Sequence, residues 1–217
     1  MTNTVTPPQN LKTVGLVSAG HFLSHFYMLL IPPLFPLLKD EFGVGFTELG
    51  LAIAVFSVVT GLTQAPIGFL VDRIGGRKIL LWGLLLESAA FICIGLFPSY
   101  WMLLAMMVVA GLANAVYHPA NYAILNASVP DTRMGQAFSI HTAAGMLGNA
   151  VAPMTVVLLI SFSDWTTALI LCGITGGLLS LLIAANAGVL QDTLPQTKIN
   201  EAKNEQSGLR LLLSPPI

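Results

Sequence analysis

Long apolar runs alternate with short polar segments along most of the chain. Within these runs Glu87 is the only Asp, Glu, Lys or Arg, and each run reaches the roughly 17–25 residues that a helix needs to cross a bilayer core. Only helices and closed barrels satisfy every backbone polar group in lipid, and the alternating strands of a barrel are absent. The pattern therefore predicts six membrane-spanning helices, at residues 14–38, 49–71, 79–97, 101–127, 135–160 and 166–190.

Composition supports a membrane protein. The chain is 55% hydrophobic and only 9% charged, whereas soluble domains carry about 25% charged residues. The net charge of -1 indicates no nucleic-acid partner. Cys93 and Cys172 both lie in apolar runs, where a lone thiol behaves as a small hydrophobe.

The basic residues predict the orientation. Lys39 is the one cation in a loop that follows an odd-numbered span, and the other eight lie in the terminal segments and the even-numbered loops. Cytoplasmic loops are enriched in Lys and Arg, so both termini are expected in the cytoplasm. The eight are Lys12, Arg73, Arg77, Lys78, Arg133, Lys198, Lys203 and Arg210.

Three segments are expected on this basis. Residues 1–13 form a cytoplasmic N-terminal segment, and residues 14–190 form the transmembrane bundle. Residues 191–217 read as a cytoplasmic linker, polar at first and apolar again from Leu209. That ending predicts the approach to a seventh span, and hence a second bundle that the sequence does not contain.

The loop between the second and third spans carries the strongest local motif. An aspartate ends one helix, glycines permit the reversal, and three cations follow or flank them; a basic cytoplasmic turn alone would also explain those cations. The order resembles the Gly-x-x-x-Asp-Arg-x-Gly-Arg-Arg loop of the major facilitator superfamily, with Gly76 in place of the first basic residue of the pair. The resemblance implies a cytoplasmic gate formed by Gly68, Asp72, Arg73, Gly75, Arg77 and Lys78.

Other segments are similar to the fosmidomycin-resistance-type branch of that superfamily. They are residues 20–27, 33–36, 64–66 and 117–119. The resemblance implies an all-α fold of six transmembrane helices, one half of a twelve-span transporter built from 3+3 inverted repeats, in a bacterial inner membrane. Ala120 and His25 depart from acidic residues that are frequent in this branch, and Ala152 departs from a glycine of the antiporter motif.

Polar side chains inside the spans predict a substrate and proton pathway. His21 and His25 are one helical turn apart and share a face. Asn114, His118 and Asn121 follow at i, i+4 and i+7, and a further polar face is expected around residue 141. Polar side chains in lipid usually face a cavity or another helix; the alternative is that they only bond neighbouring helices, at about 0.6 kcal/mol each. The expected pathway residues are His21, His25, Asn114, His118, Asn121, His141 and Glu87.

Two residues add local chemistry. Glu87 lies where an acid costs about 2.5–3.5 kcal/mol, so it is expected either to carry a proton or to bond a neighbouring helix. Pro119 removes a backbone donor and crowds the carbonyl of Ala115, which predicts a helix kink, either at a ligand site or purely structural.

The sequence contains no nucleophile–base pair, phosphate-binding loop or metal-ligand spacing, so neither an enzyme nor a cofactor or metal site is predicted. We expect secondary active transport of a small solute by alternating access, proton-coupled and directed outward. The expected partners are the solute, protons, the bilayer and a second six-helix half, either a missing C-terminal part or a second copy. The alternative is a six-helix membrane subunit that does not transport.

Overall fold

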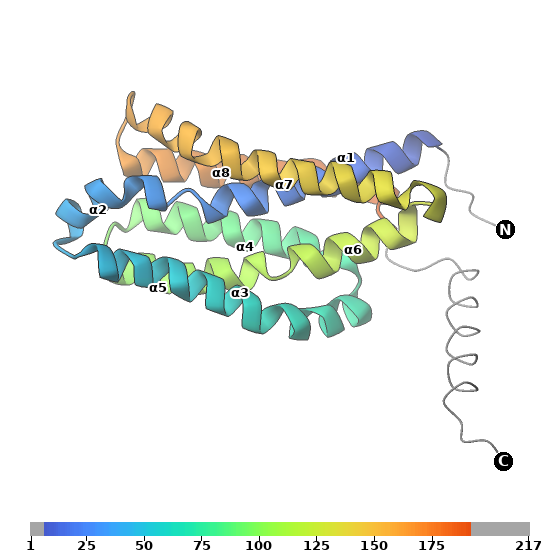
Figure 1. Ribbon diagram of the computed structural model, residues 1–217, viewed down its shortest axis with the longest axis horizontal. Coiled ribbons are helices and arrows are strands. Elements are labelled where there is room, and N and C mark those ends of the chain that lie inside the picture. Colours follow the sequence, from blue (N-terminus) through green and yellow to red (C-terminus); the bar gives the residue numbers. More distant parts are fainter. Residues whose placement is uncertain (1–6, 192–217) are drawn as a thin grey trace, which may run out of the picture.

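The computed structural model describes residues 7–191, and every regular element in that range is helical. The long helices lie side by side along one axis and form a bundle (Figure 1). They are α1 (Pro7–Met28), η1 (Pro32–Leu34), α2 (Phe35–Phe42), α3 (Phe46–Ile74), α4 (Gly76–Leu96), α5 (Tyr100–Asn114), α6 (Tyr117–Ser128), α7 (Asp131–Ile160), α8 (Trp165–Ala185) and η2 (Ala187–Val189).

These elements form six candidate membrane spans within the described residues, which confirms the predicted all-α membrane fold. Their length and apolar composition are sufficient to cross a bilayer. The spans are Asn10–Phe42, Phe46–Ile74, Gly76–Leu96, Tyr100–Ser128, Asp131–Ile160 and Trp165–Ala185.

The first span is not the continuous helix that the hydropathy pattern predicts. Helix α1 ends at Met28, and the chain continues through η1 into α2. Pro32, Pro33 and Pro36 lie in this stretch and cannot donate the backbone hydrogen bonds of a helix interior. Mean hydropathy does not detect such an interruption, because the residues around it remain apolar.

The fourth span is also divided. Helix α5 ends at Asn114 and α6 begins at Tyr117, so Ala115 and Val116 lie between them. The break falls one turn before Pro119, which has no N–H to bond the carbonyl of Ala115. The ladder resumes with the bond from Ala120 N to Val116 O, 3.0 Å.

The sixth helix is shorter than predicted. Helix α8 ends at Ala185, and the amide of Asn186 donates to the carbonyl of Leu182 at 2.8 Å. Asparagine side chains compete in this way with the backbone for helix carbonyls. The chain then forms the short η2 and reaches Gln191, the end of the described range.

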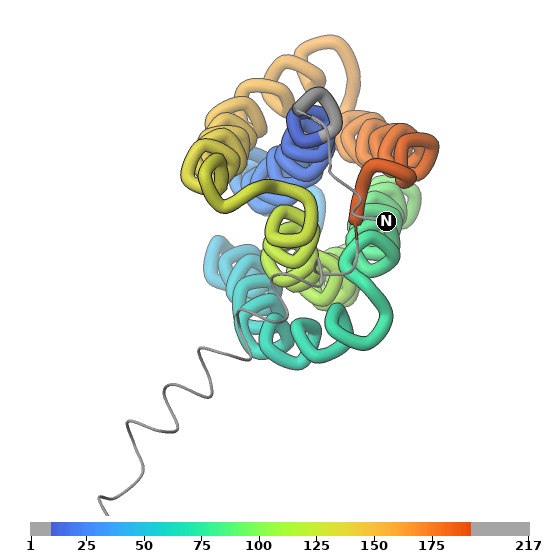
Figure 2. The backbone as a smooth tube through the Cα atoms, turned by 90° about the vertical axis from the view of Figure 1, so that its right-hand side faces the viewer, coloured from blue at the N-terminus to red at the C-terminus, as the bar shows by residue number. Residues whose placement is uncertain are grey.

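Helix α1 lies inside the bundle. It packs against α7 and α6, while α4 packs against α8 and α5, and α3 packs against α5; the view along the bundle shows this arrangement (Figure 2). Tyr27 of α1 joins three helices, because its ring stacks on Phe91 at 4.7 Å and its hydroxyl donates to Cys172 O at 3.0 Å. These contacts hold α1 against α4 and α8 and leave its other side toward α6 and α7.

The loops divide between the two ends of the bundle. The α3–α4 and α6–α7 connections lie at the end where α1 begins, and the α2–α3, α4–α5 and α7–α8 connections lie at the other (Figure 1). The α3–α4 turn is the single residue Gly75, whose φ of 99° is accessible mainly to glycine. Arg73, Arg77, Lys78 and Arg133 are therefore gathered at one end.

Part of the predicted N-terminal segment lies within the described residues. Residues 7–13 are helical and belong to α1, and Thr13 Oγ1 donates to Val189 O at 2.9 Å. Residues 1–6 of the predicted N-terminal segment and residues 192–217 of the predicted linker lie outside the described range.

Candidate functional site

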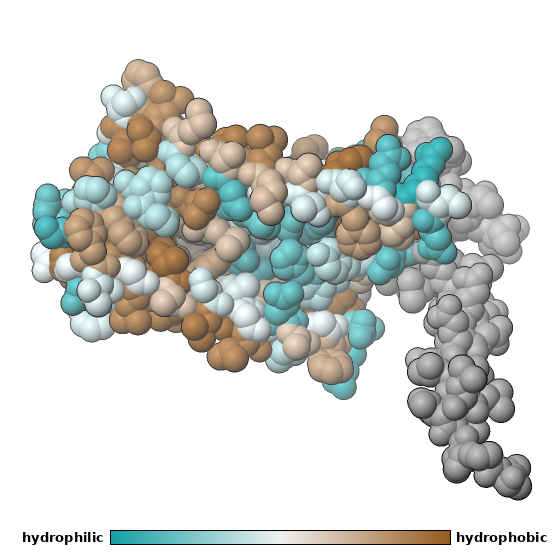
Figure 3. All heavy atoms as spheres, viewed as in Figure 1, coloured by the Kyte–Doolittle hydropathy of each residue, from teal (hydrophilic) through white to brown (hydrophobic). Residues whose placement is uncertain are grey.

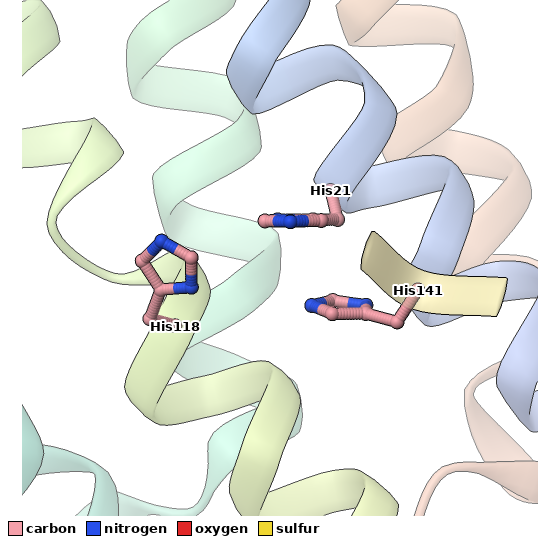
Figure 4. Close-up of side chains that lie close together, drawn as sticks. All are labelled: His21, His118 and His141. Atoms are coloured by element: carbon pink, nitrogen blue, oxygen red, sulfur yellow. The ribbon is translucent and has the colours of Figure 1, made fainter. Parts of the chain in front are cut away.

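All four histidines of the chain meet between α1, α6 and α7. The His21 ring stacks on His141, with centroids 3.9 Å apart and planes 13° apart. The His21 centroid lies 4.5 Å from that of His25 and 5.1 Å from that of His118. In the close-up, His21, His118 and His141 point toward one another from three helices (Figure 4).

The histidine cluster is half buried and has few hydrogen-bond partners. His21 is 4% exposed and His141 is 1% exposed, while His25 and His118 are half-buried. Among the residues that the structure describes, the Nδ1 atoms of all four rings, and Nε2 of His141, have no hydrogen-bond partner. Buried polar atoms are normally paired, and an exception requires an explanation such as a ligand or water.

Gly145 of α7 makes room for the cluster. A Cβ atom at this position would lie 2.7 Å from Nε2 of His21 and 3.0 Å from Cδ2 of His25. Any larger residue would displace both rings, so the missing side chain sets how closely α7 approaches the imidazoles of α1.

Glu87 belongs to a separate hydrogen-bonded network. This carboxyl is fully buried on α4 and accepts from Tyr117 Oη at 2.7 Å and from Asn114 Nδ2 at 3.0 Å. Asn114 Nδ2 also lies 3.2 Å from Ser24 O of α1, in donor geometry. The network thus reaches α1 within one turn of His21 and His25.

The predicted stripe of Asn114, His118 and Asn121 is not one helical face. The break at Ala115 and Val116 separates Asn114 on α5 from the other two on α6, so the spacing of a continuous helix does not apply across it. Asn114 binds Glu87, His118 joins the histidines, and Asn121 is fully buried with neither amide atom hydrogen-bonded.

The predicted gate residues are not part of the histidine cluster. Gly68, Asp72 and Arg73 lie on α3, Gly75 forms the turn, and Arg77 and Lys78 begin α4. Asp72, Arg73 and Lys78 are exposed, while Arg77 Nη1 donates to Ala187 O at 3.1 Å. Arg77 therefore ties the α3–α4 turn to the end of the last span.

Two residues of the site escaped the sequence analysis. Tyr117 contributes the shortest hydrogen bond to Glu87, at 2.7 Å, and a buried tyrosine hydroxyl generally needs such a partner. Nor did the sequence pattern assign Gly145 to the site, although its missing side chain makes room for His21 and His25. One possible ligand nitrogen from each of His21, His118 and His141 lies within 4.8 Å of the other two. The sequence did not indicate this group, because metal motifs are recognised by local spacing and these three residues are far apart in sequence.

The face over the cluster is polar among apolar surroundings. Hydrophilic residues gather in the middle of this face, over α6 and between α7 and α3, with hydrophobic residues to either side (Figure 3). Only 17% of the apolar stretch of α3 and 22% of that of α7 is buried, against 61% for the first span. Both long helices therefore offer exposed apolar sides that flank the polar strip.

The family follows from a match that covers most of the chain. The family model described as Major Facilitator Superfamily matches residues 17–217. The chain belongs to the Major Facilitator Superfamily. The resemblance inferred from the α3–α4 loop and from the first and fourth spans is thereby confirmed, and the protein is an integral membrane protein of a family that transports small solutes.

Relatives within the Major Facilitator Superfamily include named transporters. The fosmidomycin resistance protein of Escherichia coli is 24% identical over 148 residues, covering 68% of this chain and 36% of that protein. The drug efflux pump JefA of Mycobacterium tuberculosis is 27% identical over 192 residues, covering 88% and 38%. An uncharacterised MFS-type transporter, YfnC of Bacillus subtilis, is 26% identical over 145 residues, covering 67% and 35%. The chain thus spans just over a third of these relatives.

A solved structure shows the same fold. A bacterial homolog of the human lysosomal transporter Spinster, in an inward-facing and unoccupied conformation, aligns with a TM-score of 0.77 at 16% identity. The alignment covers 88% of this chain and 45% of that one. The expected six-helix half of a major facilitator fold is confirmed.

Proposed function

We propose that this chain forms one half of a proton-coupled secondary transporter that moves a small solute outward by alternating access. The observation that carries the proposal is the histidine cluster. Four imidazoles lie between three helices of an apolar bundle, two of them buried, and each has a nitrogen without a partner among the described residues. Polar groups in a membrane interior that bond nothing are costly to keep, and they most often mark a solute or ion pathway.

Two sites divide the work in this proposal. The histidines His21, His118 and His141, with Asn121, bind the solute, and His25 lies beside them on α1. Glu87 carries the proton. Asn114 couples the protonation state of Glu87 to α1, because its amide nitrogen bonds both the Glu87 carboxyl and Ser24 O. Loss of the charge on Glu87 would change the hydrogen bonds that Asn114 and Tyr117 donate to its carboxyl. These two residues flank the break between α5 and α6.

The second six-helix half packs on the exposed apolar sides of α3 and α7, which closes the solute site from the other side. The α3–α4 turn acts as the gate, with Asp72, Arg73 and Lys78 free to face the partner half. Both termini lie in the cytoplasm of a bacterium, since the basic loops share one end of the bundle. The outward direction rests on the efflux named for the relative JefA.

Solute-driven proton movement tests the function. The intact gene product is reconstituted in proteoliposomes, and internal pH is followed while a solute panel is added. We expect at least one solute to move protons, His118→Ala to abolish its effect, and Glu87→Gln to retain solute binding without proton flux. Thr175→Ala serves as a control, because its exposed hydroxyl bonds only Leu171 O of its own helix.

The rival is a six-helix subunit whose polar residues only join helices. It predicts that no solute moves protons and that His118→Ala and Glu87→Gln only lower the unfolding temperature. These two results together would overturn the transport proposal and support the rival.

A further inference from the structure

The histidine cluster also has the composition of a metal site. One nitrogen each from His21, His118 and His141 lies within 4.8 Å of the other two. His21 and His141 are more than nine-tenths buried, and each has at least one ring nitrogen without a hydrogen-bond partner among the described residues. Their rings lie close to that of His118 (Figure 4). Lone pairs of neutral imidazole that bond no donor are available to a cation.

We propose that His21, His118 and His141 bind a divalent transition-metal ion. The inference deepens the proposed function, on which it rests, by giving a ligand class to the solute site.

The donor set selects the class of metal. All three ligand atoms are imidazole nitrogens, and the group contains no carboxylate. Imidazole suits zinc, nickel, cobalt and copper, whereas magnesium and calcium prefer oxygen ligands. A site made of three histidines therefore discriminates against the abundant hard cations.

The distances require only side-chain movement. Tetrahedral zinc with Zn–N bonds of about 2.0–2.1 Å places its ligand nitrogens about 3.4 Å apart. The nitrogens must therefore close by at most about 1.4 Å, within reach of ring rotation. The stack of His21 on His141 must open in the process, because parallel rings 3.9 Å apart direct their lone pairs side by side rather than at one point.

Three protein ligands leave a fourth position open. Sites of this kind hold water or an exchangeable ligand there, whereas structural zinc sites are closed by four protein ligands. Glu87 is the one acid within the spans, and the Asn114 bridge brings its network to the backbone of α1 beside the histidines.

His25 is a neighbour and not a ligand. It lies 4.5 Å from His21 between ring centroids, but its side chain hydrogen-bonds Asn149. This distinction gives the experiment a matched control on the same helix.

Equilibrium binding of Co²⁺ and Zn²⁺ tests the site. The intact gene product is purified in detergent with a non-histidine tag, in a Cys93→Ser/Cys172→Ser background that removes both thiols. We expect one saturable Co²⁺ per chain, a tetrahedral or five-coordinate visible spectrum, and displacement by Zn²⁺. His141→Gln and His118→Gln should weaken the apparent affinity by at least about tenfold, because even outer-shell substitutions cost 10–100-fold, while His25→Gln should leave it within about threefold.

Two glycine variants test the site without removing any histidine. Gly145→Ala retains every histidine but displaces the rings of His21 and His25, so it should also weaken binding. Gly135→Ala on the same helix has no atom within 4 Å of the added Cβ and should bind as the parent does.

Two results overturn the metal site: no saturable binding, or equal loss of affinity in His25→Gln and His141→Gln. Binding needs no gradient or solute, so it is judged separately from transport. Metal binding without proton flux would remove the proposed function, and flux of an organic solute without metal binding would remove this inference alone.

Discussion

Glu87 is held by the two ends of a broken helix. Asn114 is the last residue of α5 and Tyr117 is the first of α6, and each donates to one oxygen of the same carboxyl. The break at Ala115 and Val116 therefore lies directly beside the buried acid.

Removing one donor should cost stability. Tyr117→Phe deletes the hydroxyl that bonds Glu87 at 2.7 Å and leaves the ring in place. We expect the free energy of unfolding to fall by about 1–3 kcal/mol, because a buried acceptor loses its partner. Thermal unfolding in detergent measures the change.

Tyr122→Phe is the matched control, since Tyr122 is 40% exposed on the same helix. Equal unfolding temperatures for Tyr117→Phe and the parent would mean that this hydrogen bond contributes nothing to the buried acid.

Most polar residues of the site were predictable singly, but their grouping was not. The one-turn spacing of His21 and His25 follows from helix geometry, and their contact was implied. The stacking of His141 on His21 depends on how α7 packs on α1, which no spacing within either helix encodes. Asn114 went to Glu87 instead of a shared stripe because the helix breaks directly after it.

At the scale of elements, polar caps fix where several helices begin. Ser99 Oγ accepts from Met102 N at 3.2 Å before α5, and Asp164 Oδ1 accepts from Thr167 N at 2.8 Å before α8. Such side chains satisfy backbone donors that have no partner within the helix, for about 1 kcal/mol each. Both caps lie outside the apolar spans, where water competes for them.

The cap of α8 should make the stability of the protein depend on pH in the acidic range. Hydrogen bonds from the hydroxyl of Thr166, and from the N–H and hydroxyl of Thr167, lower the pKa of Asp164 from 3.8 to about 2. A lowered folded-state pKa gives stabilisation that is present above pH 3.8 and is lost as pH falls toward 2. We expect Asp164→Asn to unfold at a temperature that changes less than the parent's between pH 4 and pH 2.

The comparison is made as a difference between parent and variant, so that effects common to both cancel. Glu41→Gln, an exposed acid at the same end of the bundle, provides the reference slope. Parallel curves for the parent and Asp164→Asn would show that the cap does not contribute.

Hydropathy located all six spans, because bilayer thickness and backbone satisfaction leave few alternatives. It missed the interruption after Met28 and the early end of α8. Those features depend on missing proline donors and on one asparagine amide, and neither changes mean hydropathy. Pro66 and Pro153, by contrast, lie inside continuous helices α3 and α7, so proline alone does not decide the outcome.

At the scale of the whole molecule, charge separates the two ends of the bundle. The α3–α4 and α6–α7 turns carry Arg73, Arg77, Lys78 and Arg133, whereas the opposite end carries acids such as Glu48 and Asp164. This asymmetry is the physical basis of the proposed orientation.

Cysteine labelling in cells tests that orientation. In the background lacking both native thiols, Lys78→Cys and Ser163→Cys place single exposed thiols at opposite ends. We expect a membrane-impermeant maleimide to label only Ser163→Cys in intact cells and both variants after lysis. The reverse pattern in intact cells would place the basic end outside.

Helix length has a consequence for the choice of lipid. Helices α4 and α8 have 21 residues each, about 32 Å at 1.5 Å per residue, which closely matches a hydrocarbon core of about 30 Å. Helix α3 has 29 residues, about 44 Å, and can absorb a change in thickness by tilting or by projecting into the headgroups. A thicker bilayer therefore strains α4 and α8 first, and because α4 carries Glu87, acyl-chain length becomes a variable that acts on the buried acid.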